Sequence, residues 1–273
     1  MLRLSALYRY PLKSGKGQQV QGIGLDKLGL DGDRRWMLVD EASGRFLTQR
    51  AVAKMSQLSA LWNEAGGLTL SAPGHGVIEV PLPPAHEEQR RGVIIWRDTL
   101  RVPDAGDEAA AWVSAFIGNP TRLVHVPVEL ARTTAAGYGK DDDKVAFADG
   151  FPLLLIGQAS LQDLSGRVGR PLEMLRFRPN LVVEGSEAFA EDGWKRIRIG
   201  DIELRVVKPC SRCIMTTIDP QTGERDPQRD PQREPFATLL QYRSTPDGAM
   251  FGQNLVNDGN GSLEVGMPVE VLE

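Results

Sequence analysis

The chain has 273 residues, enough for one large domain or two of modest size. With 41% hydrophobic and 25% charged residues it has the composition of an ordinary globular protein, which excludes a mostly disordered chain. It carries 32 Lys and Arg against 36 Asp and Glu, a net charge of -4, so we expect no nucleic-acid partner. No apolar run approaches the ~18–20 residues of a membrane-spanning helix, so we also expect no membrane partner.

The N-terminus and the cysteines indicate where the protein resides. Residues 1–10 alternate between apolar and polar side chains and include charges, which predicts a strand and not a signal peptide. Cys210 and Cys213 are the only cysteines, which excludes a disulfide framework and a cluster held by four cysteines of this chain. We therefore expect a cytoplasmic, reducing compartment.

The first half of the chain is predicted to consist mainly of strands. A helix is expected from Asp107, which can cap it, to Gly118, because Ala111, Trp112, Ala115 and Phe116 form a helical stripe. The strands are expected at residues 2–8, and as hairpins at 36–40 with 45–48, 68–70 with 77–80, and 93–96 with 100–102.

The second half mixes strands with a few helices. Strands are expected at 122–126, 151–156 and 181–184, and over 197–207 with a turn at Gly200-Asp201. Helices are expected at 159–168 and 235–242, and a terminal hairpin at 263–272. Strands and helices do not alternate regularly, so the pattern favours a strand-rich α+β fold with barrel-like sheets over a doubly wound fold. The turn-rich 118–120 segment suggests two domains, 1–122 and 123–273. A duplicated Arg-Asp-Pro-Gln segment at 225–235 is interpreted as a solvent loop.

The strongest candidate for chemistry is Lys208-Pro-Cys-Ser-Arg-Cys213. A thiolate is a preferred ligand of soft metals, and the positive charges of Arg212 and Lys208 favour the thiolate form. The three histidines lack metal-ligand spacing, so structural zinc is not expected. The β-branched residues after Cys213 predict a strand, which argues against a thioredoxin-like dithiol. On spacing alone, two inert buried thiols remain the alternative.

Four further segments carry charges or carboxamides suited to an anionic ligand. In the 11–17 loop, lysines and backbone N–H groups can hold a phosphate, although the order of residues is not that of a Walker A loop. In 33–36 and 176–180, strand alternation would direct one arginine of each pair inward. In 250–255, carboxamides can pair with a heterocycle edge. For each segment, an ordinary solvated or paired side chain is the alternative.

Together, and in this order along the chain, the segments resemble one family. Pro-Leu-Lys-Ser, Asp-Arg-Arg-Trp, Arg-Phe-Arg-Pro-Asn, Cys-Ser-Arg-Cys with Thr-Thr-Ile-Asp-Pro, and Phe-Gly-Gln-Asn are similar to those of a MOSC protein with its N-terminal β-barrel domain. Within this family, the segments resemble the branch of the amidoxime-reducing molybdenum enzymes and their bacterial relatives. The resemblance implies an N-terminal MOSC β-barrel domain at 1–122 and a MOSC β-barrel domain with peripheral helices at 123–273.

The resemblance also implies a cofactor and a set of site residues. The cofactor is a molybdenum-pyranopterin (the molybdenum cofactor), and the residue that matches the family's metal ligand and catalytic cysteine is Cys213. Its pterin and phosphate would be held by the remaining matching positions, which are Lys13, Ser14, Arg34, Asp149, Arg178, Asn180, Ser211, Arg212 and Asn254. A phosphate dianion requires convergent cations, so we expect Lys13, Arg34 and Arg178 to lie close together.

The expected function is that of an oxidoreductase, located in the cytoplasm, that reduces the N–O bond of small N-hydroxylated compounds. Two cysteines cannot build a cluster and no Rossmann fingerprint is present, so electrons are expected from a separate ferredoxin-like or cytochrome-like donor. A C-terminal ferredoxin domain, common in the bacterial relatives, is not expected here. The alternatives are a sulfur- or molybdenum-cofactor carrier with a persulfide on Cys213, and a binding domain with inert thiols.

Overall fold

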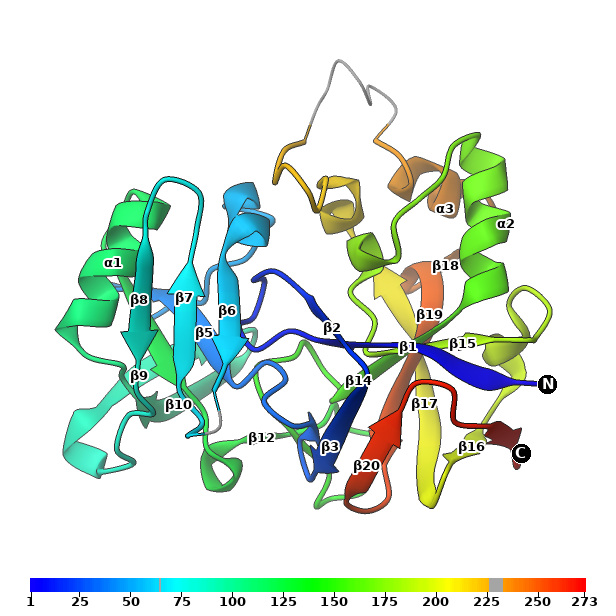
Figure 1. Ribbon diagram of the computed structural model, residues 1–273, viewed down its shortest axis with the longest axis horizontal. Helices are drawn as coiled ribbons and strands as arrows, with labels where there is room; N and C mark the ends of the chain where they lie inside the picture. Colours follow the sequence, from blue (N-terminus) through cyan, green and yellow to red (C-terminus); the bar gives the residue numbers. More distant parts are fainter. Residues whose placement is uncertain (64, 226–232) are drawn as a thin grey trace.

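The computed structural model describes residues 1–63, 65–225 and 233–273. The chain forms two lobes that lie side by side, a smaller one around β5 to β11 and α1 and a larger one around a long sheet (Figure 1). The described part is strand-rich α+β, as predicted, and its sheets are open and not closed barrels. Most of the duplicated 225–235 segment lies outside the described residues.

A nine-stranded sheet forms the larger lobe, in the order β2-β1-β15-β14-β19-β17-β16-β21, with β18 paired to β19. Within it β14 and β15 run parallel and are linked through helix α2, while the other pairs are antiparallel. Its strands are β1 (Arg3–Arg9), β2 (Gln18–Val20), β14 (Leu153–Gly157), β15 (Leu181–Glu184), β16 (Arg196–Ile199), β17 (Ile202–Arg212), β18 (Ser244–Thr245), β19 (Gly248–Asn257) and β21 (Val269–Val271).

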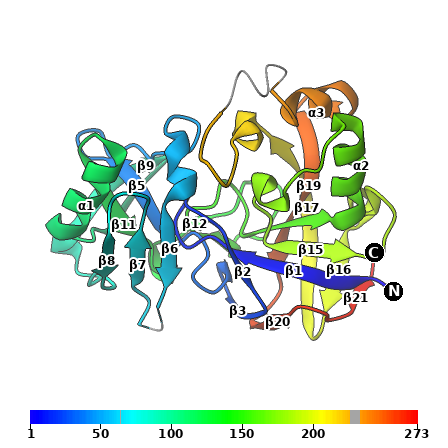
Figure 2. The same ribbon diagram turned by 45° about the horizontal axis from the view of Figure 1, so that its top comes forward.

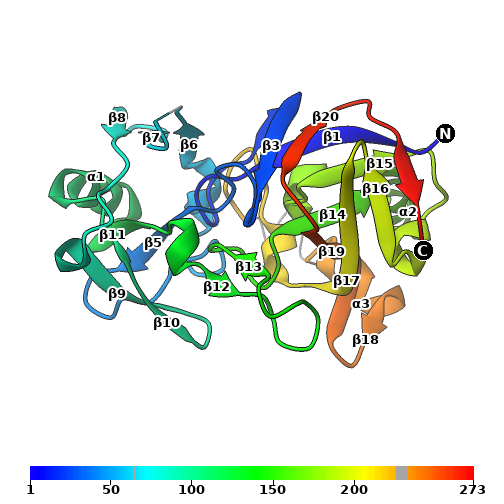
Figure 3. The same cartoon turned by 90° about the horizontal axis from the view of Figure 1, so that it is seen from below.

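Short sheets of two or three strands complete the fold. Figure 3 shows β3 beside β20, at the edge of the larger lobe. The sheets are β20-β3-β4 (Gly261–Glu264, Gly22–Asp26, Gly29–Leu30), β6-β7-β8 (Ser59–Trp62, Leu68–Ser71, Val77–Val80), β10-β9 (Asp98–Pro103, Arg90–Ile95), β11-β5 (Thr121–His125, Trp36–Asp40) and β12-β13 (Arg132–Thr133, Lys144–Val145).

In the part of the chain that the structure describes, three α-helices cover these sheets. Helix α1 (Asp107–Ile117) packs its apolar side on the core of the smaller lobe, while α2 (Gln158–Val168) and α3 (Phe236–Tyr242) lie next to each other on the large sheet (Figure 2). No helix of the described residues is long and apolar enough to cross a bilayer. The 3-10 turns are η1 (Ala53–Gln57), η2 (Glu87–Gln89), η3 (Val128–Leu130), η4 (Met174–Phe177), η5 (Ala190–Gly193) and η6 (Ile214–Thr217).

The N-terminal strand connects the two halves of the sequence. Strand β1 lies between β2 and β15, so the first residues of the chain belong to a sheet made mostly of residues after 150. Strand β3 likewise pairs with β20 near the C-terminus. The division at residues 122 and 123 stays a prediction, and whatever its position, the larger lobe needs residues from both ends of the chain.

One predicted hairpin is wrong and another is shorter than expected. The terminal segment 263–272 is not a hairpin, because β20 pairs with β3 whereas β21 pairs with β16. The 45–48 segment does return along β5, but through a single antiparallel bridge between Val39 and Phe46. Strand β11, distant in the sequence, pairs with β5 along its whole length. The hairpins β7-β8, β9-β10 and β16-β17 form as expected.

The N-cap of α1 is a smaller correction. Gly106 occupies the N-cap position expected for Asp107, and the Oδ1 atom of Asp104 accepts the Gly106 N–H at 2.8 Å. Asp107 therefore becomes the first helical residue and forms an ion pair with Arg122 at 2.8 Å.

Replacement of Leu7 by alanine tests the role of β1. Leu7 is fully buried in the core beneath the large sheet, so Leu7→Ala should lower the free energy of unfolding by about 2–5 kcal/mol through lost burial and the cavity left behind. Urea denaturation followed by circular dichroism measures the change. The control is Leu61→Ala in β6, a leucine that is 51% exposed, for which a change within about 0.5 kcal/mol is expected. Equal effects of both variants would show that β1 does not hold the core together.

Candidate functional site

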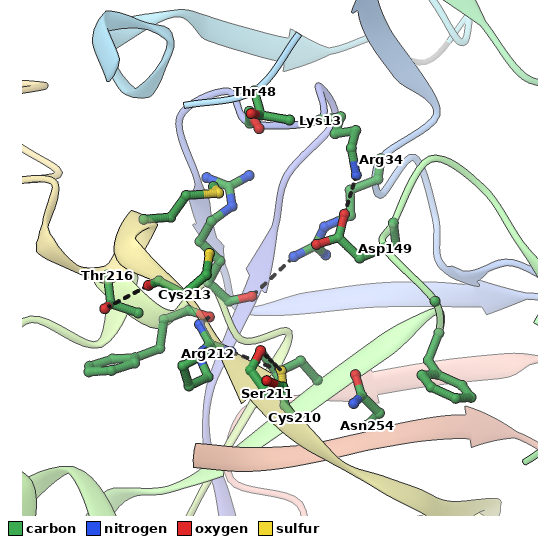
Figure 4. Close-up of a pocket in the computed structure, with 18 of the residues that line it drawn as sticks. Lys13, Arg34, Thr48, Asp149, Cys210, Ser211, Arg212, Cys213, Thr216 and Asn254 are labelled. Carbon is green, nitrogen blue, oxygen red and sulfur yellow. Dashed lines mark hydrogen bonds and ion pairs between the residues drawn. The ribbon is translucent and has the colours of Figure 1, made fainter. Parts of the chain in front are cut away.

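A single cavity between the two lobes collects residues from seven separate segments of the chain. Its empty space, with the open mouth included, is about 820 Å³. In Figure 4, Lys13, Thr48, Arg34 and Asp149 lie on one side, and Cys210, Ser211 and Asn254 on the other. The lining residues are Lys13, Ser14, Arg34, Thr48, Arg50, Ala148, Asp149, Gly150, Phe151, Leu153, Leu154, Arg176, Phe177, Arg178, Asn180, Cys210, Ser211, Arg212, Cys213, Met215, Thr216 and Asn254.

Three of these residues have an unusual backbone. Ser14, Arg34 and Arg178 have φ angles of 62°, 49° and 56°, in the left-handed region that residues with a Cβ rarely adopt. Arg34 follows a turn before β5, and Arg178 ends η4. Backbone strain of this kind is concentrated at functional sites, because the surrounding fold must impose it.

The two arginine pairs differ in how they meet the expected alternation, and neither 33–35 nor 176–178 is a regular strand. In the first pair one arginine is directed to the site, as expected: Arg34 turns into the cavity beside Asp33, whereas Arg35 is buried against Asp26 at 2.6 Å and does not line it. The second pair departs from the expectation. Arg176 and Arg178 both line the cavity, and Arg176 donates to Ile218 O at 3.0 Å.

The ring of Tyr10 brings two of the cations together. The Cζ atoms of Arg34 and Arg178 lie 4.6 and 4.2 Å from its centroid. Arg34 also donates to Arg178 O at 3.0 Å, and Arg178 donates to Gly15 O at 2.6 Å. Burial, together with the charge of Arg34, lowers the pKa of Arg178 to about 10. The expected convergence of Lys13, Arg34 and Arg178 is therefore present in the structure.

The cavity has an excess of positive charge. Of the described residues that line it, six are Lys or Arg and one, Asp149, is acidic, while Asp33 and Asp219 outside the lining pair with Arg34 and Arg176. Arg50, Arg178 and Arg212 form no ion pair with a described residue, and the buried Nη2 atom of Arg178 and the buried Nε atom of Arg212 have no hydrogen-bond partner among the described residues. Unused donors and unpaired cations in one cavity are the features of an anion-binding site.

Lys13 and Asp149 form an ion pair at the cavity wall. Lys13 is buried, and its Nζ atom donates to Phe147 O at 2.7 Å and to the Asp149 carboxylate. The Asp149 side chain is 65% exposed to the cavity. Burial acts to raise its pKa, but the charges of Lys13, Arg50 and Arg34 outweigh burial and lower that pKa to about 2. Asp149 is therefore an anion at any physiological pH and holds Lys13 in place.

The two thiols have different surroundings. The Nη1 atom of Arg212 donates to the Cys210 sulfur at 3.0 Å, and its Nη2 atom donates to Phe177 O at 2.6 Å. Arg212 is therefore tied to Cys210, although the sequence suggested that it would lie beside the Cys213 sulfur. The Cys213 thiol lines the cavity without a hydrogen-bond partner among the described residues.

The segment after Cys213 is not the predicted strand. Strand β17 ends at Arg212, and η6 (Ile214–Thr217) begins immediately after Cys213. The hydroxyl of Thr216 donates to Cys213 O at 3.1 Å, and that of Thr217 donates to Ile214 O at 2.7 Å. Hydroxyl groups that bond to the backbone three residues earlier stabilise a turn, and they outweigh the β-propensity of these side chains. The turn leaves Cys213 at the end of a strand, facing the cavity.

The two asparagines and Ser211 are held by the protein itself. Asn180, 1% exposed, accepts from Arg34 at 3.1 Å and donates to Tyr8 O at 3.2 Å, so it positions Arg34. Asn254 donates to Lys208 O at 3.2 Å, and Ser211 donates to Asp247 O at 2.9 Å. Each nevertheless has part of its side chain or backbone at the cavity lining.

All ten site residues expected from the sequence line this one cavity, while their roles stay predictions. Thr48 and Arg50 also line the cavity, but they lie in an ordinary turn and carry no sequence motif. Met215 and Thr216 line it as well, because the segment predicted to be a strand is a 3-10 turn. Arg176 belongs to a recognised motif, although the resemblance does not place it among the site residues.

Comparisons with known proteins agree along the whole chain. The MOSC N-terminal beta barrel domain matches residues 1–120 and the MOSC domain matches residues 142–270. Mitochondrial amidoxime-reducing component 1 of Mus musculus is 33% identical, over 98% of this chain and 82% of that protein. Mitochondrial amidoxime reducing component 2 of Rattus norvegicus is 34% identical, over 97% and 82%. Among solved structures, the YUAD protein of Bacillus subtilis matches 98% of this chain and 94% of that chain, at 11% identity and a TM-score of 0.42.

The excess of cations predicts that the protein binds inorganic phosphate. Phosphate at ten times its Kd should stabilise the fold by about 1.4 kcal/mol over chloride at equal ionic strength, measured by thermal unfolding. Arg178→Met should raise that Kd by about tenfold to a hundredfold, because a charge-assisted hydrogen bond is lost. The control is Arg198→Met, which removes an exposed arginine of β16 that pairs with Glu270, and its phosphate response should equal that of the wild type. An unchanged response in Arg178→Met would contradict the assignment of the anion site.

Proposed function

The chain belongs to the family of the amidoxime-reducing components, which join a MOSC N-terminal domain to a MOSC domain, and on this premise we propose that it is a molybdenum-dependent oxidoreductase. Its proposed substrates are small N-hydroxylated compounds, of which the amidoximes named for its relatives are one class. The observation that carries the proposal is the placement of the Cys213 thiol in a cavity lined by six cations.

The chemistry of the cavity fits the molybdenum cofactor. A pyranopterin with a terminal phosphate is anionic, and the unpartnered donors of Arg178 and Arg212 are available for such a group. The metal requires a protein thiolate, and Cys213 presents a sulfur with no partner among the described residues, whereas the Cys210 sulfur already accepts from Arg212. When bound, the cofactor would supply the two-electron redox chemistry that no side chain of this protein can perform.

We assign the residues of the cavity to three tasks. Cys213 is the metal ligand. Lys13, Arg34 and Arg178 hold the phosphate, with the Tyr10 ring and Asn180 fixing the two arginines. The contacts to the remaining parts of the cofactor are assigned to Ser14, Asp149, Ser211, Arg212 and Asn254, which line the same cavity.

The proposed reaction converts an N–OH group to N–H. It breaks the N–O bond, consumes two electrons and two protons, and releases one water molecule. The protein binds and orients the substrate in the cavity, while the protons are drawn from solvent through its open mouth. Asp149 cannot be the proton donor at neutral pH, because its pKa is lowered to about 2.

We propose that the electrons come from a separate protein. The two cysteines of the sequence cannot hold an iron–sulfur cluster, and no Rossmann fingerprint offers a place for NAD(P)H or FAD. A ferredoxin-like or cytochrome-like donor would use the small, transient interface typical of electron transfer. A cytoplasmic location stays a prediction, since the relatives compared here are named as mitochondrial.

The two cysteines provide the direct test of the metal site. In protein made by a host that synthesises the cofactor, Cys213→Ser should abolish the reduction of an amidoxime and remove molybdenum from the protein, because the ligand is lost. Cys210→Ser, the matched control, should keep molybdenum and most activity. Elemental analysis and product formation measure both. Full activity of Cys213→Ser would overturn the assignment, and cyanide-labile sulfur without molybdenum in the wild type would favour the carrier function.

A second test concerns the source of electrons. The purified protein loaded with molybdenum should reduce N-hydroxylated compounds when given a chemical reductant or a ferredoxin-like or cytochrome-like donor, but not with NADH or NADPH alone. The assay follows both the oxidation of NADH or NADPH and the formation of the amidine product. Turnover with NADH in a homogeneous preparation would reveal a second redox site within this chain.

A further inference from the structure

Arg50 is a cation of the cavity that the cofactor assignment leaves unused. It lines the cavity, and its side-chain nitrogens have no hydrogen-bond or ion-pair partner among the described residues. The other cavity cations differ, because Lys13, Arg34, Arg176, Arg178 and Arg212 each donate to a backbone carbonyl of the wall. All five N–H donors of the Arg50 guanidinium are therefore available to a ligand.

The contact that Arg50 does make is with an aromatic ring. The Cζ atom of Arg50 lies 4.7 Å from the ring centroid of Trp96. Trp96 lies at the turn between β9 and β10. A guanidinium stacked on tryptophan keeps its in-plane donors free while its position is fixed. Trp96 itself packs against Phe46, with 5.0 Å between the ring centroids.

Trp96 is an unexpected residue at this turn. Its φ angle is 55°, a left-handed conformation in which glycine is preferred and a bulky side chain is disfavoured. The residue is also 41% exposed, so burial of the tryptophan does not explain its presence. A strained, exposed tryptophan that stacks on a cavity arginine is explained if the protein uses it to hold that arginine.

The turn that carries Arg50 is firmly attached to the site. The N–H groups of Ala51 and Val52 donate to Thr48 O at 3.0 and 2.9 Å, and Gln49 donates to Ser14 O at 2.8 Å. Figure 4 shows Thr48, two residues before Arg50, across the cavity from Ser211 and Asn254. Arg50 thus lines the cavity from a turn whose backbone is held at both sides.

We propose that Arg50, positioned by Trp96, binds a carboxylate of the substrate, so that the protein prefers N-hydroxylated compounds that carry a carboxylate group. The inference rests on the proposed function, whose substrate class it narrows. A carboxylate matches the guanidinium fork with two parallel hydrogen bonds, whereas Asp149, the one acidic side chain among the described lining residues, interacts with Arg50 through its charge alone and leaves that fork unfilled. In this assignment Arg50 touches the substrate, whereas Trp96 acts through Arg50 and is a positioning residue.

The test compares two substrates that differ in one group, benzamidoxime and 4-carboxybenzamidoxime. For the wild type, kcat/KM should be higher for the carboxylated compound. In Arg50→Gln the ratio of the two kcat/KM values, carboxylated over neutral, should fall about tenfold to a hundredfold, which corresponds to the loss of a hydrogen bond to a charged group. The fall should appear in KM and not in kcat, and the molybdenum content should equal that of the wild type.

Two variants separate the ring of Trp96 from its backbone strain. Trp96→Gly relieves the left-handed strain and should not destabilise the fold, yet it should lower the same ratio about threefold to tenfold because the guanidinium loses its stacking partner. Trp96→Phe keeps a ring and should restore most of the ratio. The matched control is Arg167→Gln, which removes a guanidinium stacked on Tyr242 at 4.2 Å outside the cavity, and it should leave the ratio unchanged.

The outcomes distinguish this inference from the proposed function. Suppose that the wild type reduces benzamidoxime, but Arg50→Gln changes kcat/KM equally for both substrates or for neither. The carboxylate site is then overturned, while the enzyme assignment stands. Loss of molybdenum in Arg50→Gln would assign Arg50 to the cofactor and overturn the inference. If the wild type reduces neither compound, calorimetric binding of 4-carboxybenzamidoxime decides, because the inference requires binding that Arg50→Gln weakens about tenfold or more.

Discussion

The buried ring of Tyr10 holds two guanidinium groups within 5 Å of its centroid, and the cavity depends on this contact. Arg34 and Arg178 come from segments more than 140 residues apart and carry charges that repel each other. The electron-rich faces of the ring and the donors that reach Gly15 O and Arg178 O offset this repulsion. Because the ring lies at the end of β1, the first strand of the chain sets the position of the anion site.

The backbone around the same cavity is strained. Strained left-handed residues cost roughly 1–3 kcal/mol each, and Ser14, Arg34 and Arg178 all adopt this conformation around the cavity. The rest of the fold must supply that free energy, through the fully buried cores beneath the large sheet and around α1. An anion bound between the cations would relieve part of the electrostatic cost, so the cavity is built to be completed by a ligand.

The thiol side of the cavity is arranged by different means. Strand β17 pairs with β19 along most of its length and ends where Arg212 reaches back to Phe177 O. The 3-10 turn that follows leaves the Cys213 sulfur without a hydrogen-bond partner among the described residues. The Cys210 sulfur, in contrast, accepts a hydrogen bond from Arg212. Two cysteines of one short motif thus acquire different environments.

Across the cavity, the turn from Thr48 to Val52 presents Arg50 without a hydrogen-bond partner among the described residues, so the two walls suit different ligand groups.

Local patterns in the sequence predicted much of this protein. The stripe of α1, the hairpins β7-β8, β9-β10 and β16-β17, and the buried strand before α2 each follow from residues close in the chain, whose periodicity and turns suffice to specify them. The five motif segments could likewise be recognised, because each short run keeps its lysine, arginine, cysteine or asparagine at a fixed spacing.

Only the tertiary structure decided which distant strands and side chains these segments contact. The partners of β5, β20 and β21 are strands distant in sequence, and the left-handed turns at Arg34 and Arg178 arise because Tyr10 and the Gly15 carbonyl hold both side chains in place. Arg50 carries no motif, and its importance follows from its contact with Trp96 and its place in the cavity wall. Such contacts depend on pairings across the whole chain, which local propensity does not encode.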